Sequence, residues 1–318
     1  MGLLSSYLVL VAVVVMVSVP VSAGASPVPA EVVQTRQNLD FWLETMIVYH
    51  GYSVDEAARV CGLPARDVEE RVAELGLSGK SVSPRAEDGT IRVLPYPGGR
   101  HPRIGFLEGA IDPQRGTKVS IFPPWENAGY VVLDLPEAIF SNLGLIFLAH
   151  THIPTIWDEQ NTVIENVDWT LDDNGTLRMA RTLPNGITFG AVVDPETDHV
   201  SLELWLENGT ENTLTELRTQ LCLMLKGAPG FNDQTKERTL LKSPVAAVKH
   251  KDRDRWILVA FERCGRVWDN PQVPCIHSDP VLPDVSAGNR VSVKGRLWFY
   301  EGKDVEQEIA RTKTTLAN

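Results

Sequence analysis

The sequence lacks the surplus of basic side chains that a nucleic-acid partner requires. Its 318 residues include 41 Asp and Glu but only 30 Lys and Arg, so the formal net charge is −11. Because phosphate binding needs a basic face, this balance excludes a nucleic acid as the main partner. The sequence also lacks a C-x-x-C pair, a G-x-S-x-G motif and a Walker motif. It therefore predicts no structural zinc knuckle, serine-nucleophile elbow or nucleotide-binding loop.

A long apolar run is found only near the N-terminus. Residues 1–25 include the stretch YLVLVAVVVMVSVPVSAGA, which ends in small residues. This is typical of a secretory signal and its cleavage site. We therefore expect a cleaved signal peptide over residues 1–25 and an exported protein, periplasmic or extracellular, with no stable membrane insertion after cleavage. The alternative is an uncleaved N-terminal anchor, since the run falls just short of the ~20 residues that span a bilayer.

Residues 31–78 have the apolar period of helices. The stretch NLDFWLETMIVYH carries an apolar helical stripe, and Ser53 and Glu56 have the spacing of a capping box. Pro64 stands in the first turn of a further helix. The spacing therefore predicts three short helices with tight turns.

Residues 53–78, which include most of the stretch YSVDEAARVCGLPARDVEERVAELGL (52–77), resemble a bacterial helix-turn-helix. From residue 39 to residue 78 there are eight acidic and three basic side chains, which argues against DNA as its target. We expect instead a small acidic helical unit over residues 31–78 that packs against the rest of the chain or contacts a protein partner.

A polar linker over residues 79–89 separates this unit from residues 90–318, where the pattern becomes β. Eleven short runs rich in β-branched and aromatic residues are separated by Gly, Pro, Asn or Asp, with no helical segment between them. This excludes a βαβ sheet and favours a sandwich or barrel. The final stretch DVEQEIARTKTTL is amphipathic. We predict a mainly β fold, a large antiparallel β-supersandwich with a C-terminal helix laid against the sheet.

Within residues 175–225, two strands joined by LPNG are followed by VSLELWLENGTENTLTEL. This pattern resembles the galactose-mutarotase-like supersandwiches, in which such a strand crosses the sheet and leads into the sugar cleft. The resemblance implies a carbohydrate ligand. It does not extend to the histidine that mutarotases carry after this strand, because Gln220 and Cys222 stand there. The chain as a whole also resembles a family of exported bacterial proteins without an assigned activity.

The motif LAHTHIPTIWD places His150 and His152 on one face of an expected strand. Together with His277 they are a candidate set of ligands for one divalent metal ion, Zn²⁺ or similar, which would polarise a carbonyl or activate water. The metal-free alternative is acid–base catalysis by a histidine paired with Asp158, Asp279 or Tyr130. A third interpretation is structural, with one histidine facing a polar cleft and the other capping a strand end.

Three tryptophans stand beside Glu, Asp or Asn in segments expected to be loops: Trp125, Trp157 and Trp268. An aromatic face flanked by polar groups suits a sugar ring, so these residues are candidates for substrate binding. Arg103 is a further candidate, because a guanidinium binds a carboxylate or phosphate through two parallel hydrogen bonds. For Arg103 the alternative is pairing with acidic residues on the surface.

Four cysteines are present, and Cys264 and Cys275 flank the turn-rich segment GRVWDNPQVP. In an oxidising compartment this spacing predicts a disulfide between them. The alternative is that all four cysteines are buried, reduced thiols.

Together these observations predict an exported carbohydrate-binding protein that acts on a sugar or polysaccharide as an epimerase, lyase or hydrolase. The three histidines would carry the chemistry, supported by Asp158 and Asp279. The alternative is a non-catalytic module that recognises a carbohydrate or a cell surface, with the helical unit serving assembly. Convergence of the histidines favours the enzyme, whereas histidines scattered over the surface favour the module.

Overall fold

The structure is a computed structural model that describes residues 36–80, 83–101, 116–149, 153–233, 236–270 and 272–316. Several of the predictions above lie outside the described residues, namely the signal peptide (1–25), Arg103, His150 and His152. Within the described part of the chain, the search for a helix with the length and apolarity needed to cross a membrane finds none.

The N-terminal helices form as predicted. Helix α1 runs directly into the π-helix η2, and α2 and α3 follow after short turns; their bounds are α1 (Arg36–Glu44), η2 (Thr45–Tyr49), α2 (Val54–Cys61) and α3 (Ala65–Glu74). The Ser53 side chain accepts from the Glu56 backbone N–H and the Glu56 carboxylate accepts from Ser53, so the capping box is complete. Gly62 ends α2 with φ +64°, a conformation that glycine adopts without strain.

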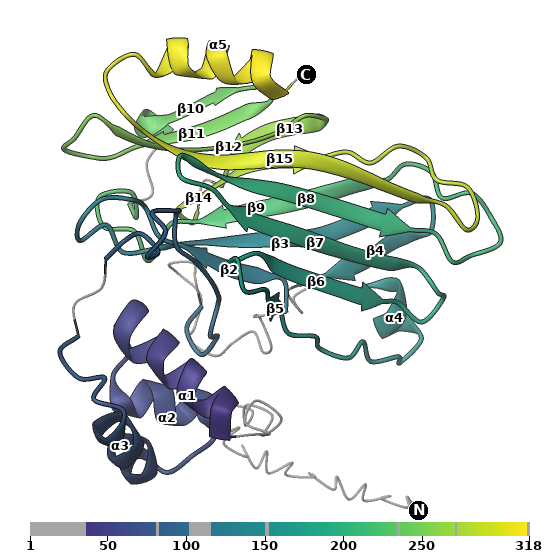
Figure 1. The fold of residues 1–318 in the computed structure, drawn as a ribbon. Coiled ribbons are helices and arrows are strands. Elements are labelled where there is room, and N and C mark those ends of the chain that lie inside the picture. The colour runs from purple at the N-terminus through teal and green to yellow at the C-terminus, as the bar shows by residue number, and fades with distance from the viewer. Residues whose placement is uncertain are drawn as a thin grey trace, which may run out of the picture.

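Within the described residues, fifteen strands build two antiparallel sheets, and Figure 1 shows their arrangement. The seven-stranded sheet has the spatial order β1 (Val93–Pro95), β2 (Lys118–Ile121), β3 (Val131–Ser141), β9 (Arg218–Met224), β14 (Cys275–Pro280) and β13 (Cys264–Asp269), with β4 (Gly144–Leu148) also paired to β3. The eight-stranded sheet has the order β10 (Thr239–Lys242), β11 (Val245–Lys249), β12 (Arg255–Phe261), β15 (Arg290–Glu301), β8 (His199–Glu207), β7 (Thr188–Pro195), β6 (Leu177–Thr182) and β5 (Thr170–Leu171). The mainly β, two-sheet fold is confirmed.

The main core lies between the inner faces of the two sheets. Strand β6 alternates buried and exposed residues, as expected of a strand with one face in the core. The core joins residues of both sheets, such as Leu133, Leu223 and Ile276 from one and Leu204 and Ile257 from the other. Burial of this apolar surface is the main stabilising contribution to the fold.

Three short helices complete the chain: α4 (Ile156–Glu159), the 3₁₀-helix η3 (Lys236–Arg238) and α5 (Val305–Leu316). Helix α5 lies against the outer face of the eight-stranded sheet, where Val305 and Ile309 pack in a second apolar cluster with Trp298 (Figure 1). The Trp298 Nε1–H group donates to Glu308 Oε1 at 3.0 Å. The predicted C-terminal helix is therefore confirmed.

The helical unit, residues 36–80, contacts the outer face of the seven-stranded sheet through His50. The ring Nδ1 donates to the carbonyl oxygen of Thr45 at 2.7 Å, and Nε2 accepts from the Ser120 hydroxyl on β2, also at 2.7 Å. The ring also packs edge-on against Tyr130, with centroids 4.5 Å apart. Burial lowers the pKa of His50 from 6.5 to about 4, so the ring is neutral near neutral pH.

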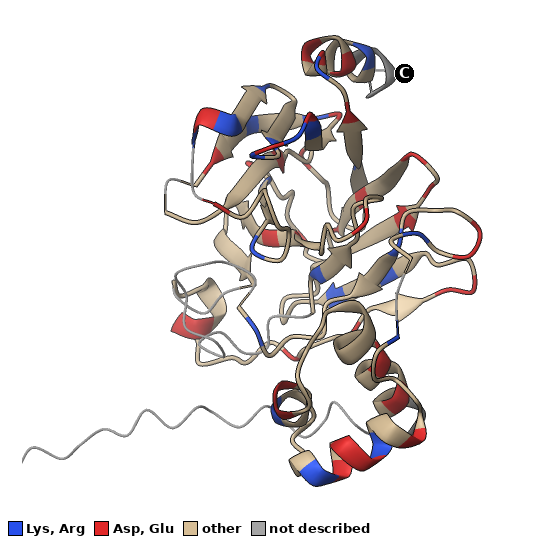
Figure 2. Ribbon diagram, turned by 90° about the vertical axis from the view of Figure 1, so that its left-hand side faces the viewer, with Lys and Arg blue, Asp and Glu red and all other residues tan. Residues whose placement is uncertain are grey.

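A second contact joins the helical unit to the segment that follows β1. The Arg100 guanidinium pairs with Glu56 at 2.7 Å and lies 3.8 Å from the centroid of the Tyr52 ring. The hydrogen bond from Arg100 lowers the pKa of Glu56 to about 2. Acidic residues are prominent on the helices of this unit, as Figure 2 shows.

The main difference from the sequence prediction concerns residues 264–280. The sequence predicts a turn-rich loop over residues 265–274, but the chain up to Asp269 belongs to β13, which forms a hairpin with β14. Its register pairs Cys264 with Pro280 and Asp269 with Ile276, so Cys264 and Cys275 stand at opposite ends of the hairpin. No disulfide joins the two sulfurs, so the predicted bond between Cys264 and Cys275 is wrong.

Candidate functional site

A row of polar and aromatic side chains crosses five strands on the outer face of the seven-stranded sheet. Lys118 on β2 pairs with Asp134 on β3, and Asp134 pairs with Cys222 on β9. Because Ile276 on β14 pairs with Leu223, the next step of that register brings His277 beside Cys222. His277 in turn pairs with Trp268 on β13. The register thus gathers residues that are distant in the sequence.

At one end of this row lies a buried ion pair. Lys118 Nζ is 2.7 Å from Asp134 Oδ2, and neither side chain is exposed to solvent. The Thr117 hydroxyl donates to the other oxygen of the same carboxylate at 2.5 Å. Two charges out of water are costly, so each depends on the other for its stability.

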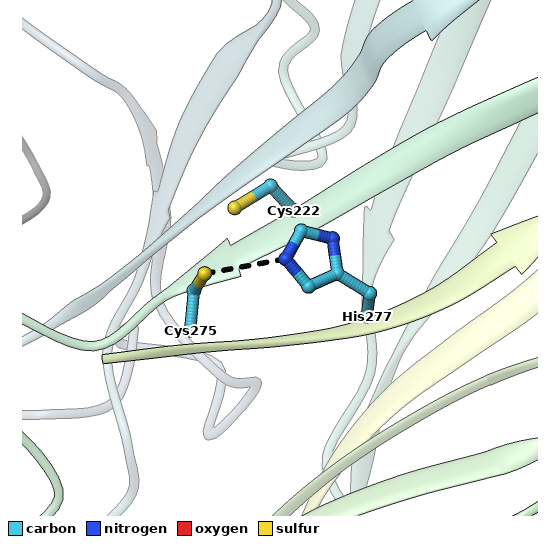
Figure 3. A group of neighbouring side chains, drawn as sticks. All are labelled: Cys222, Cys275 and His277. Atoms are coloured by element: carbon cyan, nitrogen blue, oxygen red, sulfur yellow. Dashed lines mark hydrogen bonds between the residues drawn. The ribbon is translucent and has the colours of Figure 1, made fainter. Parts of the chain in front are cut away.

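Cys222, Cys275 and His277 form a compact group in the middle of the sheet (Figure 3). The two Sγ atoms and one ring nitrogen lie within 4.8 Å of one another, and all three residues are buried. The His277 Nδ1–H group donates to the carbonyl oxygen of Leu221 at 2.5 Å, which leaves Nε2 as the lone-pair nitrogen. That lone pair faces Cys275 Sγ at 3.2 Å. This group could hold a metal ion.

The donor chemistry of the group suits a thiophilic ion. Two cysteine sulfurs and one imidazole are a donor set used for Zn²⁺, and thiolates also select Cu⁺. The hydrogen bond from Nδ1 to a carbonyl oxygen is the usual support for a ligating histidine, because it fixes the tautomer and the ring orientation. The ring is further held by stacking on Trp268, with centroids 3.6 Å apart and an angle of 12°.

Asp279 lies on the same strand and face as His277, and its oxygens are engaged by protein donors. Oδ2 accepts from Arg266 Nε at 2.6 Å and from Trp268 Nε1 at 2.8 Å, while Oδ1 accepts from the Leu221 backbone N–H at 3.2 Å. These bonds hold the indole in its stacked position over His277. Asp279 is thus a positioning residue for the His277 ring.

The second feature is a cavity of about 530 Å³ at the end of β4, beside α4 and the loop that follows it. Small-molecule sites typically have volumes of roughly 300–1,000 Å³. The polar side chains that line this cavity come from four segments: Thr117, Asp158, Asn161, Thr162, Asn166 and Arg181. Its apolar wall includes Phe147, Ile153, Trp157 and Ile164.

Helix α4 builds one wall of this cavity. The Thr155 N–H and hydroxyl both donate to Asp158 Oδ2 at 2.7 Å, which caps the helix. The backbone hydrogen bond from Thr155 is the main cause that lowers the pKa of Asp158, so this carboxylate is ionised. Trp157 is buried and donates from Nε1 to the Ile146 carbonyl oxygen at 2.7 Å, which fixes α4 to β4.

The predicted site residues therefore divide into separate groups. His277, Asp279 and Trp268 come together on the outer face of the seven-stranded sheet, in strands and not in the predicted loops. Trp157 and Asp158 line the cavity.

Trp125 belongs to neither group. It is buried in the main core and stacked on Phe231, with centroids 6.1 Å apart. A tryptophan beside Pro and Glu in a loop is equally suited to anchoring that loop in the core.

Cys222 and Arg181 were missed as candidates from the sequence. Cys222 joins Cys275 and His277 only through strand register, which the sequence does not reveal. Arg181 could have been found from the sequence. It alternates with Leu177 and Met179 on β6, so its side chain is expected on the same, inward-facing side of the strand.

Comparisons with known proteins give distant structural likenesses and no family. No family model matches the chain, and no curated protein matches it in sequence. A protein described as a kojibiose phosphorylase from the human microbiome is 10% identical, with a TM-score of 0.37 over 59% of this chain and 26% of its own. The Slr1438 protein from Synechocystis sp. is 14% identical, with a TM-score of 0.33 over 60% of this chain and 91% of its own.

A polysaccharide lyase is 10% identical, with a TM-score of 0.35 over 67% of this chain and 33% of its own. This chain therefore covers about a quarter of the phosphorylase and a third of the lyase. TM-scores this low transfer no residue role to this chain.

Proposed function

We propose that this chain is an exported carbohydrate-binding protein and that its sugar site is the cavity beside α4. The observation that carries the proposal is the composition of the cavity wall. A sugar ring has hydroxyl groups around its edge and C–H groups on its faces, so it needs hydrogen-bonding side chains next to an apolar surface. Asn161, Thr162 and Asn166 provide the first, and Phe147 and Ile164 the second.

Chemistry on the bound sugar would come from the histidine motif. His150 and His152 stand in the sequence between Ala149 and Ile153, and both of these neighbours line the cavity. In the catalytic form of the proposal, one of these histidines acts as acid or base in an epimerisation, an elimination or a hydrolysis. In the alternative form the cavity binds a sugar without reaction. Incubating oligosaccharides with wild type and with the His150→Ala, His152→Ala double variant, followed by mass spectrometry, separates the two forms.

The binding proposal is tested by filling the cavity. Asn166 is exposed and lines the cavity, whereas its exposed neighbour Glu165 is not part of the wall. Binding of neutral, carboxylated and sulfated tetrasaccharides is measured by calorimetry for wild type, Asn166→Trp and Glu165→Trp. We expect at least one tetrasaccharide to bind wild type and Glu165→Trp equally, and Asn166→Trp at least about tenfold more weakly. Equal affinity for all three proteins overturns the cavity as the site.

A second candidate function follows from Cys222, Cys275 and His277. We propose that this group binds one divalent ion, Zn²⁺ or similar, through two thiolates and His277 Nε2. These ligands replace the expected set of three histidines, of which only His277 is among the described residues. An ion there would link β9 to β14 and so stabilise the sheet. Metal analysis of the purified wild type and of the Cys222→Ser, Cys275→Ser variant tests this.

Export and a protein partner remain part of the proposal. Export is inferred from the apolar run in residues 1–25, and secretion of the full chain fused to a reporter tests it. The helical unit is held on the sheet by His50, so a protein partner would bind its acidic outer surface (Figure 2).

A further inference from the structure

Arg181 is a buried cation at the wall of the cavity. Strand β6 buries Leu177, Met179 and Arg181 in alternation, so Arg181 continues the inward-facing row where the core gives way to the cavity. Its exposed fraction is 7%. Its guanidinium lies over the Phe147 ring, with the central carbon 5.3 Å from the ring centroid.

This guanidinium has no acidic partner among the described residues. They form no hydrogen bond or ion pair with it, and its buried Nε–H group is without an acceptor in that part of the chain. Asp158 lines the same cavity, but it forms no ion pair with Arg181, and Thr155 donates twice to its Oδ2 atom. Burial lowers the pKa of Arg181 to about 10, which still leaves the side chain charged at neutral pH.

Burying a charge without a partner of opposite charge destabilises the folded protein. A buried, unpaired cation at a cavity wall is therefore explained if a bound anionic ligand compensates its charge. The backbone leaves room for the guanidinium, because residue 116 is glycine. A Cβ atom at Gly116 would lie 2.7 Å from Arg181 Nη2 and 2.9 Å from the Val167 carbonyl oxygen. The side chain is thus accommodated at the wall with its donors unused by the described protein groups.

We infer that Arg181 binds an oxyanion of the ligand, a carboxylate or sulfate group, in the cavity beside α4. The planar guanidinium presents paired N–H donors that match the two oxygens of such a group. The inference rests on the proposed function for the location of the ligand. It adds that the bound carbohydrate is acidic, with its anionic group over Gly116 and Phe147.

The test compares matched tetrasaccharides with three variants. Arg181→Met removes the charge and retains a side chain of similar length. Arg181→Lys retains the charge but lacks the paired N–H donors of the guanidinium. Arg178→Met is the control. Arg178 lies on the outer face of the same strand and pairs with Asp172 at 2.9 Å. Calorimetry measures binding of neutral, carboxylated and sulfated tetrasaccharides to each protein at constant ionic strength, and Tm is recorded without ligand.

We expect a carboxylated or sulfated tetrasaccharide to bind Arg181→Met about 10- to 100-fold more weakly than wild type or Arg178→Met. The affinity of Arg181→Lys should lie between those of wild type and Arg181→Met. The anionic tetrasaccharide that binds identifies the oxyanion as a carboxylate or a sulfate. The Tm of Arg181→Met should not fall, since the variant removes an uncompensated buried charge. A lower Tm with unchanged affinity would make Arg181 a structural residue and overturn the inference.

Two other outcomes separate this inference from the proposed function. In the first outcome, only the neutral tetrasaccharide binds, and its binding is lost in Asn166→Trp but unchanged in Arg181→Met. This result would support the cavity as the sugar site and overturn the inference that Arg181 binds an oxyanion. If no tetrasaccharide binds, titration with acetate and sulfate decides. Arg181-dependent binding of either ion upholds the oxyanion site without the sugar, and its absence overturns both proposals.

Discussion

The lone-pair nitrogen Nε2 of His277 lies 3.2 Å from Sγ of Cys275, while Nδ1 of the same ring is hydrogen-bonded to a backbone carbonyl oxygen. The ring therefore cannot present its other nitrogen to Cys275 without losing that bond. Its orientation is set by the sheet and by stacking on Trp268, independently of any bound ion. The group is thus pre-organised for an ion that prefers sulfur and nitrogen ligands.

Removing both thiols should abolish metal binding. We expect wild type purified from zinc-supplemented medium to retain about one equivalent of metal and the Cys222→Ser, Cys275→Ser variant to retain none. Cys264→Ser is the control, because Cys264 lies at the other end of the β13–β14 hairpin. Elemental analysis by mass spectrometry measures the content. Wild type without metal, or with Cys222 and Cys275 joined in a disulfide, would contradict the prediction.

Breaking the buried ion pair should destabilise the seven-stranded sheet. Asp134→Asn leaves the Lys118 ammonium buried beside a neutral amide, and we expect the free energy of unfolding to fall by about 3–5 kcal/mol. Replacing both residues, with Lys118→Met and Asp134→Leu, should cost less than Asp134→Asn alone, since the double variant removes both buried charges together. Urea unfolding followed by tryptophan fluorescence measures the three proteins. A double variant less stable than the single one would refute this account of the pair.

Stability should depend on pH through His50. The pKa is about 4 in the folded protein and close to 6.5 in the unfolded chain. Between these values the unfolded chain binds the extra proton, so stability rises with pH across this window and is lost as pH falls from 6.5 toward 4. The full effect is about 3 kcal/mol.

The variant His50→Gln isolates this contribution, because glutamine retains hydrogen-bonding groups but does not titrate in this range. Unfolding free energies of wild type and His50→Gln are compared from pH 4 to pH 7. We expect the difference between the two proteins to shrink on acidification, as wild type loses the stability that its neutral histidine confers. A difference independent of pH would show that His50 does not titrate on unfolding.

Local sequence patterns were sufficient for most of the fold. The Ser53–Glu56 capping box and the amphipathic stripes predicted the helices, and runs such as those of β8 and β15 predicted the sheets. The hairpin of β13 and β14 was missed because its strands, CGRVWD and CIHSDP, have few apolar residues and no regular alternation, and they flank a turn-forming segment. Those polar residues are buried or paired with one another, which only the assembled sheet reveals.

The candidate site was less predictable, since it depends on contacts between distant strands. Cys222 and His277 come together through the pairing of β9 with β14, and neither has a motif that points to the other. The spacing of Cys264 and Cys275 suggested a disulfide that closes a loop. The two cysteines instead lie at opposite ends of the β13–β14 hairpin, so their sulfurs are held apart. Arg181 was predictable as an inward residue from its phase on β6, whereas its lack of a described partner required the structure.

The central claim is that the cavity beside α4 holds the ligand, and a crystal structure of the protein with its tightest-binding tetrasaccharide tests it most directly. We predict electron density for a sugar ring against Phe147, hydrogen-bonded to the Asn161–Asn166 loop, with an anionic group at Arg181. Density for the sugar elsewhere, with the cavity containing only water, would contradict the account.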